Sequence, residues 1–530
     1  MTRRLKHWGW GYEDQQPSDA DLRAAGAAIT ERLGFGYPDP ERPVPLSEVT
    51  LPDPRLEPPV ALAEICHVDS YERALHAYGR SYSDIVRAMR GRFDHPPDVV
   101  ARPRDEGDVE AVLEWAVSAG AAVIPFGGGT SVVGGVEARV GAGYAGVVTI
   151  DLKALDRVLE IDEVSRAARI QAGATGPLLE AGLAERGLTL RHFPQSFEFS
   201  TLGGWIATRA GGHFATLYTH IDDLVESVRA LTPAGVWESR RLPGSGAGVS
   251  PDRLLIGSEG TLGLITEAWV RVRPRPTHRT STGVRFPDFA SGAAAVRALS
   301  QSGLYPTNCR LIDAAEARTT GAGDGSSALL VLGFESADHD VEGSMSTALN
   351  LCSDHGGSWE RRGSRERDVV VSWREAFLGA PYLRDTLISF GILTETFETA
   401  ITWDRFEEFH AAITARTAAA VEQVCGGGSV TCRFTHVYPD GPAAYYTIVA
   451  PARRGEELEQ WAAIKLLAAD AVIEQGGTIT HHHAVGRDHR PWYDRQRPEP
   501  FAAALRGAKA AVDPAGALNP GVLLDPENRL

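Results

Sequence analysis

Three consecutive histidines, His481, His482 and His483, are the residues of this chain best suited to chemistry at neutral pH. Imidazole titrates near neutrality, so these side chains can move protons or bind substrate. On an extended strand alternate side chains point to opposite faces, so His481 and His483 would share a face. A purely structural histidine run is the alternative. No metal site is expected, because no cysteine is near and the closest acid, Asp488, fits no familiar ligand spacing.

Two tyrosines and two arginines are further candidates. Tyr445 and Tyr446 fall on a predicted strand, where one faces a pocket if the other faces away. A phenol in that position can donate or accept a proton, and core packing is the alternative. Arg310 and Arg384 each interrupt apolar sequence. A guanidinium suits binding of carboxylate or phosphate, although each arginine could equally pair with the aspartate that closely follows it.

The elements that would position these groups begin with a glycine-rich loop at 125–135, Pro-Phe-Gly-Gly-Gly-Thr-Ser-Val-Val-Gly-Gly. It follows an apolar run, 121–124, that predicts a short buried strand. Glycines adopt the positive φ angles of a concave nest, so backbone N–H groups and the hydroxyls of Thr130 and Ser131 can surround an anionic oxygen. The loop lacks the Gly-Lys-Ser/Thr ending of a P-loop and the following helix of a Rossmann unit. The loop therefore predicts a site for the pyrophosphate of a nucleotide cofactor, with a plain turn as the alternative.

Two more glycine-rich stretches follow within about 150 residues, at 194–212 and 256–265. In the first, Ser200 and Thr201 stand where a helix N-cap would be, and a helix starting there offers free N–H groups to a phosphate. The second leads into a predicted strand, 267–273. Three such loops, each beside an apolar strand, indicate a cofactor site more strongly than any one of them.

This order of motifs resembles the flavin-binding domain of the vanillyl-alcohol oxidase / p-cresol methylhydroxylase superfamily. The resemblance implies two α+β subdomains with FAD between them and its pyrophosphate on the first glycine loop. We expect non-covalent FAD, because the loop and its neighbourhood carry neither of the residues, His or Cys, that attach flavin in some members. Carried over motif by motif, the residues implied to line the cofactor are Pro125, Phe126, Gly127, Gly128, Gly129, Thr130, Ser131, Gln195, Ser196, Phe197, Glu198, Phe199, Ser200, Thr201, Thr208, Arg209, Ala210, Gly211, Glu259, Gly260, Thr261, Leu262, Gly263, Leu264 and Ile265.

The N-terminal Trp-Gly-Trp-Gly-Tyr sequence, Tyr446 and the His-His-His-Ala-Val-Gly sequence at 481–486 resemble the alkyldihydroxyacetonephosphate synthase family, and the match extends over most of the chain. That family exchanges the acyl chain of acyl-dihydroxyacetone phosphate for a fatty alcohol, without net oxidation and through an adduct at flavin N5. The resemblance implies that Tyr446 is the acid/base at the substrate carbon. It implies that His481, His482 and His483 assist proton transfer and phosphate binding, and that Arg310 and Arg384 match important arginines, the second near flavin or substrate.

One departure from the family is Ala484, which stands where glycine is usual. The alternative function is an FAD-dependent D-2-hydroxyacid dehydrogenase or oxidase, of the D-lactate or glycolate type. Those enzymes usually carry Glu-His-Gly where this chain has His-His-Ala at 482–484, which favours the synthase. A flavin-binding protein without catalysis is a third hypothesis, against which the Tyr, His and Arg candidates speak.

Bulk properties set the frame for this fold. A length of 530 residues exceeds a usual single core, and a net charge of −16 argues against nucleic acid as a partner. Five scattered cysteines fit a reducing compartment, and the sequence predicts neither a signal peptide nor a membrane span. These properties predict a cytoplasmic protein, with peripheral contact at a membrane surface left open. The resemblance to the synthase family implies a lipid-phosphate substrate and a fatty alcohol, and we expect a homodimer.

The expected fold is α+β. It has four parts: an N-terminal arm and helical region (1–94), an FAD-binding domain of p-cresol methylhydroxylase type (95–275), a substrate-binding α+β cap with an antiparallel sheet (276–480), and a C-terminal segment (481–530) that carries the His motif back to the FAD domain. Residues 364–367 and 426–429 are predicted surface loops.

Overall fold

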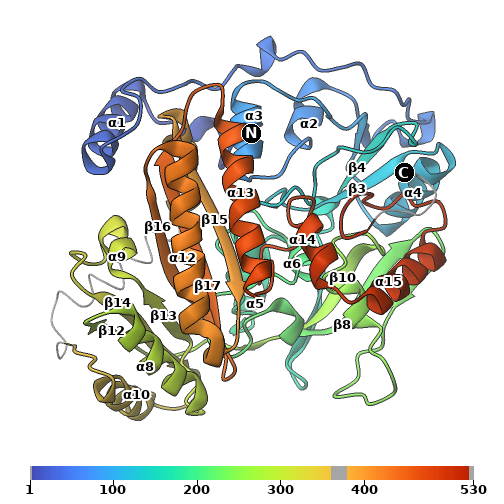
Figure 1. The fold of residues 1–530 in the computed structure, drawn as a ribbon. Helices are drawn as coiled ribbons and strands as arrows, with labels where there is room; N and C mark the ends of the chain where they lie inside the picture. The colour runs from blue at the N-terminus through green and yellow to red at the C-terminus, as the bar shows by residue number, and fades with distance from the viewer. Residues whose placement is uncertain (1–2, 360–378, 525–530) are drawn as a thin grey trace.

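The computed structural model describes residues 3–359 and 379–524 (Figure 1). The N-terminal region is an arm that crosses the top of the molecule in that view. Trp8 and Trp10 are buried in a hydrophobic cluster shared with the cap, and the backbone N–H of Trp10 donates to Asp385 at 2.8 Å. These contacts anchor the arm. Its elements are α1 (Asp19–Leu33), β1 (Cys66–His67), α2 (Ser70–Leu75) and α3 (Tyr82–Met89).

The first subdomain is a four-stranded sheet in the order β1-β2-β4-β3. Strands β2, β3 and β4 are parallel, and their residues are almost completely buried, as expected for parallel strands. The glycine loop starts at the carboxyl end of β3. The elements are β2 (Val99–Ala101), α4 (Glu106–Ser118), β3 (Ala122–Phe126) and β4 (Val147–Asp151).

The second subdomain is a five-stranded antiparallel sheet in the order β5-β6-β10-β8-β9. Helices α5 and α6 pack into its core through Leu179, Leu183, Trp205 and Ile206. The elements are β5 (Val158–Asp162), β6 (Ala167–Gln171), α5 (Gly176–Ala184), β7 (Leu188–Thr189), α6 (Leu202–Thr208), β8 (Val225–Thr232), β9 (Gly235–Glu238), α7 (Asp252–Leu255), β10 (Leu264–Arg271) and β11 (Arg273–Pro274).

The cap is a sheet of six described strands in the order β12-β14-β13-β16-β17-β15, all paired antiparallel. Helices α12 and α13 lie across one face of β15–β17 (Figure 1). The elements are β12 (His278–Phe286), α8 (Phe289–Gln301), β13 (Asn308–Ile312), α9 (Ala314–Thr320), β14 (Ala328–Ser336), α10 (Glu342–Asp354), a helix over 379–389, β15 (Ile392–Ala400), α12 (Trp403–Cys425), β16 (Ser429–Val437), β17 (Pro442–Pro451) and α13 (Glu457–Glu474).

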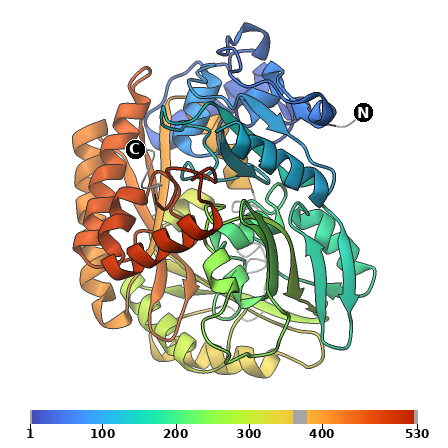
Figure 2. The same cartoon turned by 90° about the vertical axis from the view of Figure 1, so that its right-hand side faces the viewer.

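The C-terminal segment leaves the cap and returns to the first two sheets. Its helices are α14 (Arg490–Gln496) and α15 (Glu499–Val512), and the segment is drawn in red in Figure 2. Beyond α15, Leu518 forms a parallel bridge with Val123 of β3, and Asn519 donates to the carbonyl of Glu259 at 2.7 Å. The segment therefore ties the cap to both parts of the expected FAD domain.

The structure confirms the predicted fold class of two α+β subdomains and a cap with an antiparallel sheet. One local expectation is wrong: residues 481–483 form a bent loop and no strand. Residues 426–428 form the expected loop, whereas 364–367 lie outside the described residues. All five cysteines are free. Within residues 3–359 and 379–524, no helix has the length and apolar character needed to cross a bilayer.

Candidate functional site

The glycine loop lies against the second glycine-rich stretch so closely that side chains would not fit. A Cβ on Gly127 would collide with the Thr201 hydroxyl, and one on Gly128 would collide with the carbonyl oxygen of Phe199. Within the described residues, none of the backbone N–H groups of 128–131 donates a hydrogen bond. A concave backbone with unused donors is what an anionic phosphate group requires, so this loop fits the expected pyrophosphate.

The third glycine-rich stretch meets the same loop. Gly260 has a φ of +74°, and a Cβ there would collide with the ring of Pro125. Thr201 caps α6 by accepting the N–H of Gly204, as the N-cap prediction required. By contrast, Leu262, Leu264 and Ile265 are core side chains, which leaves only their backbone to face a cofactor.

The rest of the predicted cofactor residues frame this contact. The 195–199 turn packs through Phe197 against Gly176 and Trp205, and Glu198 accepts the Tyr382 hydroxyl at 2.7 Å. Arg209 adopts a left-handed conformation at the end of α6 and precedes Gly211. A Cβ on Gly211 would lie 3.1 Å from the Cβ of His482. The end of α6 therefore joins the glycine loops to the histidines.

The histidine loop is held by one buried carboxylate, that of Glu398 on β15. Its oxygens accept the backbone N–H groups of all three histidines. The distance is 3.1 Å for His482 and 2.7 Å for His483, and the hydrogen bond from His481 is short. The Thr480 hydroxyl also donates to it at 2.7 Å. These contacts turn the loop so that three adjacent imidazoles lie side by side, which the strand expectation excluded.

The other end of the histidine loop is held from the FAD side. The carboxylate of Glu259 accepts the N–H groups of Val485 at 2.9 Å and Gly486 at 2.8 Å. Burial raises the pKa of Glu259 to about 7, although the two donors oppose this. Ala484 has a φ of +73°, a conformation that favours glycine and that explains the usual glycine there.

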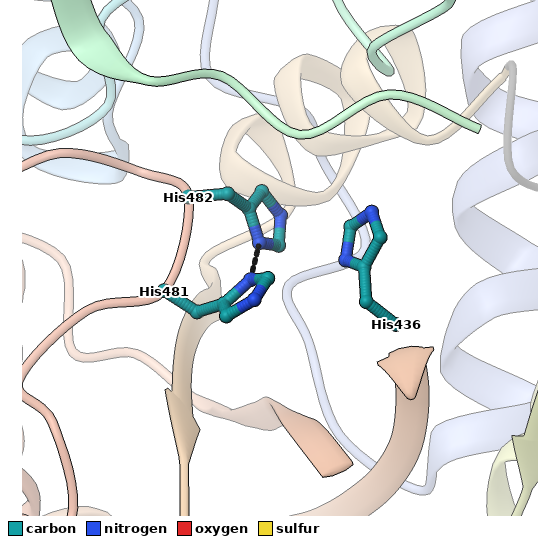
Figure 3. A group of neighbouring side chains, drawn as sticks. All are labelled: His436, His481 and His482. Atoms are coloured by element: carbon teal, nitrogen blue, oxygen red, sulfur yellow. Dashed lines mark hydrogen bonds between the residues drawn. The ribbon is translucent and has the colours of Figure 1, made fainter. Parts of the chain in front are cut away.

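Three imidazoles from two elements converge beside this loop (Figure 3). His436 of β16, His481 and His482 each offer a ring nitrogen, and these nitrogens lie within 4.8 Å of one another. His481 Nδ1 and His482 Nδ1 are 3.1 Å apart, and Tyr438 Oη lies 2.8 Å from His481 Nε2. Burial lowers the pKa of each of the three histidines well below its usual value, so they are neutral at physiological pH.

The structure separates the two adjacent tyrosines. Tyr445 faces the histidines, with its ring 5.5 Å from that of His483 and 6.1 Å from that of His482. Tyr446 points to the other face of β17, where its hydroxyl lies 3.0 Å from His410 Nδ1 of α12 and its ring stacks on Phe397. The geometry therefore brings Tyr445, and not the predicted Tyr446, to the histidine loop.

Both predicted arginines border this region. Arg310 is buried on β13 and donates to the carbonyl of His213 at 3.3 Å. Burial, aided by the nearby charge of Arg433, lowers its pKa to about 9. Arg384 donates to the carbonyl of Arg80 at 3.4 Å, and Arg80 N–H donates to Ser131 of the glycine loop. The aspartates close behind them accept backbone N–H groups, Asp313 from Glu316 and Cys432 and Asp385 from Trp10.

Sequence reasoning missed Glu398, His436 and Tyr438. Glu398 lies in a strand that the pattern did not single out, and its role depends on backbone donors. His436 lies at the end of β16 and Tyr438 follows two residues later, a spacing that could have marked both side chains as facing one side.

Comparison with known proteins identifies both halves of the chain. Residues 97–239 match the family "FAD binding domain", and residues 275–523 match "FAD linked oxidases, C-terminal domain". The chain is 30% identical over 483 residues to the alkyldihydroxyacetonephosphate synthase of Trypanosoma brucei brucei, covering 86% of this chain and 78% of that protein. It is 29% identical over 484 residues to the synthase of Dictyostelium discoideum, with the same coverage. It is 25% identical over 449 residues to the glycolate oxidase subunit GlcD of Bacillus subtilis, covering 83% and 91% of the two chains.

Solved structures agree with this assignment. An alkyldihydroxyacetonephosphate synthase structure superposes with a TM-score of 0.80 at 25% identity, covering 97% of this chain and 98% of the other. A substrate-bound p-cresol methylhydroxylase superposes with a TM-score of 0.68 at 15% identity, covering 97% and 99%, and shares the fold.

Proposed function

We propose that this chain, which belongs to the alkyldihydroxyacetonephosphate synthase family, exchanges the acyl chain of an acyl-dihydroxyacetone phosphate for a fatty alcohol. The chain is an FAD-dependent enzyme. In this exchange the C–O bond from the substrate carbon to the acyl oxygen breaks, and a C–O bond to the alcohol oxygen forms. A fatty acid leaves, the alcohol proton balances its carboxylate, and no electron acceptor is consumed.

The observation that carries the proposal is the double attachment of the histidine loop. Glu398 of the cap sheet accepts the N–H groups of His481, His482 and His483. Glu259 of the third glycine stretch accepts the N–H groups of Val485 and Gly486. The loop is thereby fixed between the cofactor loops and the cap. Acid/base groups held at that junction are placed for chemistry next to a bound cofactor.

The residues present fit FAD held without a covalent bond. The N–H groups of 128–131 would hold its pyrophosphate, with Gly127 and Gly260 allowing the close approach of the loops. Bound FAD supplies an electron-pair acceptor, so that one difficult substitution at carbon divides into easier steps without net oxidation.

Tyr445 and His483 are the proposed proton-transfer pair. Their rings are 5.5 Å apart in an edge-to-face arrangement. Burial lowers the pKa of His483, so the imidazole is neutral and can accept the proton of the alcohol hydroxyl. Such a positioned acid/base group contributes about 10²–10⁴-fold to rate.

Arg310 and Arg384 are the proposed partners of the substrate phosphate. Arg310 lies close enough to Arg433 for their charges to repel, so binding of a phosphate dianion beside them is favoured. Arg384 stands near His483 and reaches the glycine loop through Arg80.

Because the substrates are lipids, we also propose peripheral contact with a membrane. A homodimer is the proposed assembly. Sedimentation of the protein and its flotation with vesicles test these two points.

The test is a product assay on the purified FAD-loaded protein. Palmitoyl-dihydroxyacetone phosphate and hexadecanol should give the ether lipid and free palmitate in equal amounts by mass spectrometry. D-lactate and glycolate with a dye acceptor form the second arm, because one relative is a glycolate oxidase subunit. Dye reduction by a 2-hydroxy acid, with no ether formed in the first arm, would replace the synthase by a dehydrogenase.

A further inference from the structure

The convergence of His436, His481 and His482 has the geometry of a cation site. Figure 3 shows a ring nitrogen of His436 directed toward the His481–His482 pair. The two Nδ1 atoms of that pair are 3.1 Å apart, and one nitrogen from each of the three rings lies within 4.8 Å of the others. Two imidazole nitrogens that share a tetrahedral zinc ion, each about 2.0–2.1 Å from the metal, are separated by about 3.3 Å.

The partners of these rings fix which nitrogens carry protons. His436 Nε2 lies 3.1 Å from the carbonyl of Gly212, which can only accept, so the neutral ring has its proton on Nε2. Its Nδ1 carries no proton and lies 3.2 Å from Thr435 Oγ1. His481 Nε2 lies 2.8 Å from Tyr438 Oη, and Tyr438 Oη lies 2.9 Å from Thr219 Oγ1, to which it can donate. Tyr438, or His220 Nε2 at 3.2 Å, can therefore accept the proton of His481 Nε2. His481 Nδ1 then accepts from His482 Nδ1, whose proton a bound metal would displace.

Metal-binding histidines typically donate their second ring N–H to a carbonyl or another fixed acceptor, which sets the tautomer and the ring orientation. His436 and His481 have such partners. The backbone of His481 and His482 is fixed as well, because Glu398 accepts both N–H groups. The same carboxylate lies 3.9 Å from His482 Nδ1 and supplies negative charge beside the cluster.

We propose that His436, His481 and His482 bind a divalent transition-metal cation of the zinc class through their Nδ1 atoms. Imidazole ligands suit zinc, cobalt, nickel and copper, whereas magnesium and calcium prefer oxygen. Three protein ligands leave one position open, as in sites where a metal meets substrate. The next step rests on the proposed function: the open position takes an anionic oxygen of the lipid phosphate substrate. His483 is outside the set and stays free for proton transfer.

The experiment uses FAD-loaded protein purified without a polyhistidine tag, stripped with dipicolinate and dialysed. Titration with Co²⁺ should give about one bound equivalent, with an absorption band at wavelengths longer than those of oxidised flavin. His436→Ala removes one ligand and should weaken Co²⁺ binding by more than about 100-fold. Tyr438→Phe removes a partner of His481 Nε2 and should weaken Co²⁺ binding by about 10–100-fold. His483→Asn is the matched control, because it changes the adjacent histidine and should keep the metal.

Flavin content and melting temperature are measured on each variant, so that a folding defect is recognised. Failure of the stripped wild-type protein to bind Co²⁺ or Zn²⁺ while FAD is retained would overturn the inference. An equal loss of Co²⁺ affinity in His436→Ala and His483→Asn would also overturn it. Ether formation is assayed in the same samples. Ether formed by protein that binds no metal overturns the metal site and leaves the synthase function standing. Metal bound by the wild-type protein with no ether formed upholds the site and refutes the function.

Discussion

Replacing Glu398 by glutamine should loosen the histidine loop and destabilise the protein. One oxygen of Glu398 accepts the Thr480 hydroxyl and the N–H groups of His482 and His483, and the other accepts the N–H of His481. Glutamine presents an NH₂ group in place of one of these oxygens. Whichever way the amide is oriented, at least one buried backbone donor then faces another donor.

The size of the effect follows from the hydrogen bonds that are lost. An unsatisfied buried donor costs about 1–3 kcal/mol, and each remaining bond loses about 1 kcal/mol when its acceptor is no longer charged. Burial raises the pKa of Glu398, but His483, His481 and the hydrogen bonds outweigh it and lower the pKa from 4.5 to about 2. The histidine charges that contribute to this shift are present only at low pH, so the lost hydrogen bonds set the size of the effect at neutral pH, and the lowered pKa adds a stabilising contribution. Because the folded-state pKa is the lower one, this contribution is complete above pH 4.5 and is lost as the pH falls toward 2.

The assay is thermal unfolding at neutral pH, followed by flavin fluorescence, together with steady-state ether formation. A loss of about 3 kcal/mol lowers the melting temperature of a cap-sized domain by about 6–12 °C, and displacement of the histidines by about 1 Å lowers kcat by about 100-fold. Glu395→Gln is the control: Glu395 is also buried on β15, but its carboxylate accepts Trp461 Nε1–H of α13 and the N–H of Thr396, and neither donor belongs to the histidine loop. Unchanged melting temperature and kcat in Glu398→Gln would refute the reasoning.

Three further predictions concern the two tyrosines, the glycine loop and a buried acid. Tyr445→Phe should lower kcat by about 10²–10⁴-fold. Tyr446→Phe loses one buried hydrogen bond and should cost about 1 kcal/mol of stability with kcat retained, and equal loss of kcat in both would contradict the assignment. Gly128→Ala should abolish FAD retention, measured as the ratio of flavin to protein absorbance. Gly343→Ala should keep FAD, because a Cβ there meets open space. Burial raises the pKa of Asp488 from 3.8 to about 7, so wild-type stability falls by a few kcal/mol as the pH rises through that range. Asp488→Asn should therefore raise the melting temperature above pH 7 and have a smaller effect near pH 4, and a pH-independent difference would count against this.

The sequence predicts much of this fold because its strands and loops are locally marked. Apolar runs beside glycine-rich stretches predicted β3 and β10, and the N-cap residue Thr201 predicted the start of α6. Glycines of three separate stretches were expected at one cofactor, and the contacts of Gly127, Gly128 and Gly260 bring those stretches together.

The arrangement of the candidate site depends on contacts that no local pattern encodes. The strand parity of Tyr445 and Tyr446 could be predicted, but which face meets the histidines is decided by the side of the sheet that α12 covers. The histidine loop looked like a strand because its shape comes from Glu398, which is remote in sequence and acts on backbone donors. His436 joins His481 and His482 only after the cap sheet and the C-terminal segment have packed together.

The central claim, exchange of one C–O bond for another without net oxidation, is tested most directly by labelling. The FAD-loaded protein is mixed without oxygen or added acceptor with palmitoyl-dihydroxyacetone phosphate and hexadecanol whose hydroxyl carries heavy oxygen. The account predicts that the ether product retains the heavy oxygen, that the released palmitate carries none, and that turnover continues over many cycles. Turnover that requires an electron acceptor, or heavy oxygen absent from the ether, would contradict it.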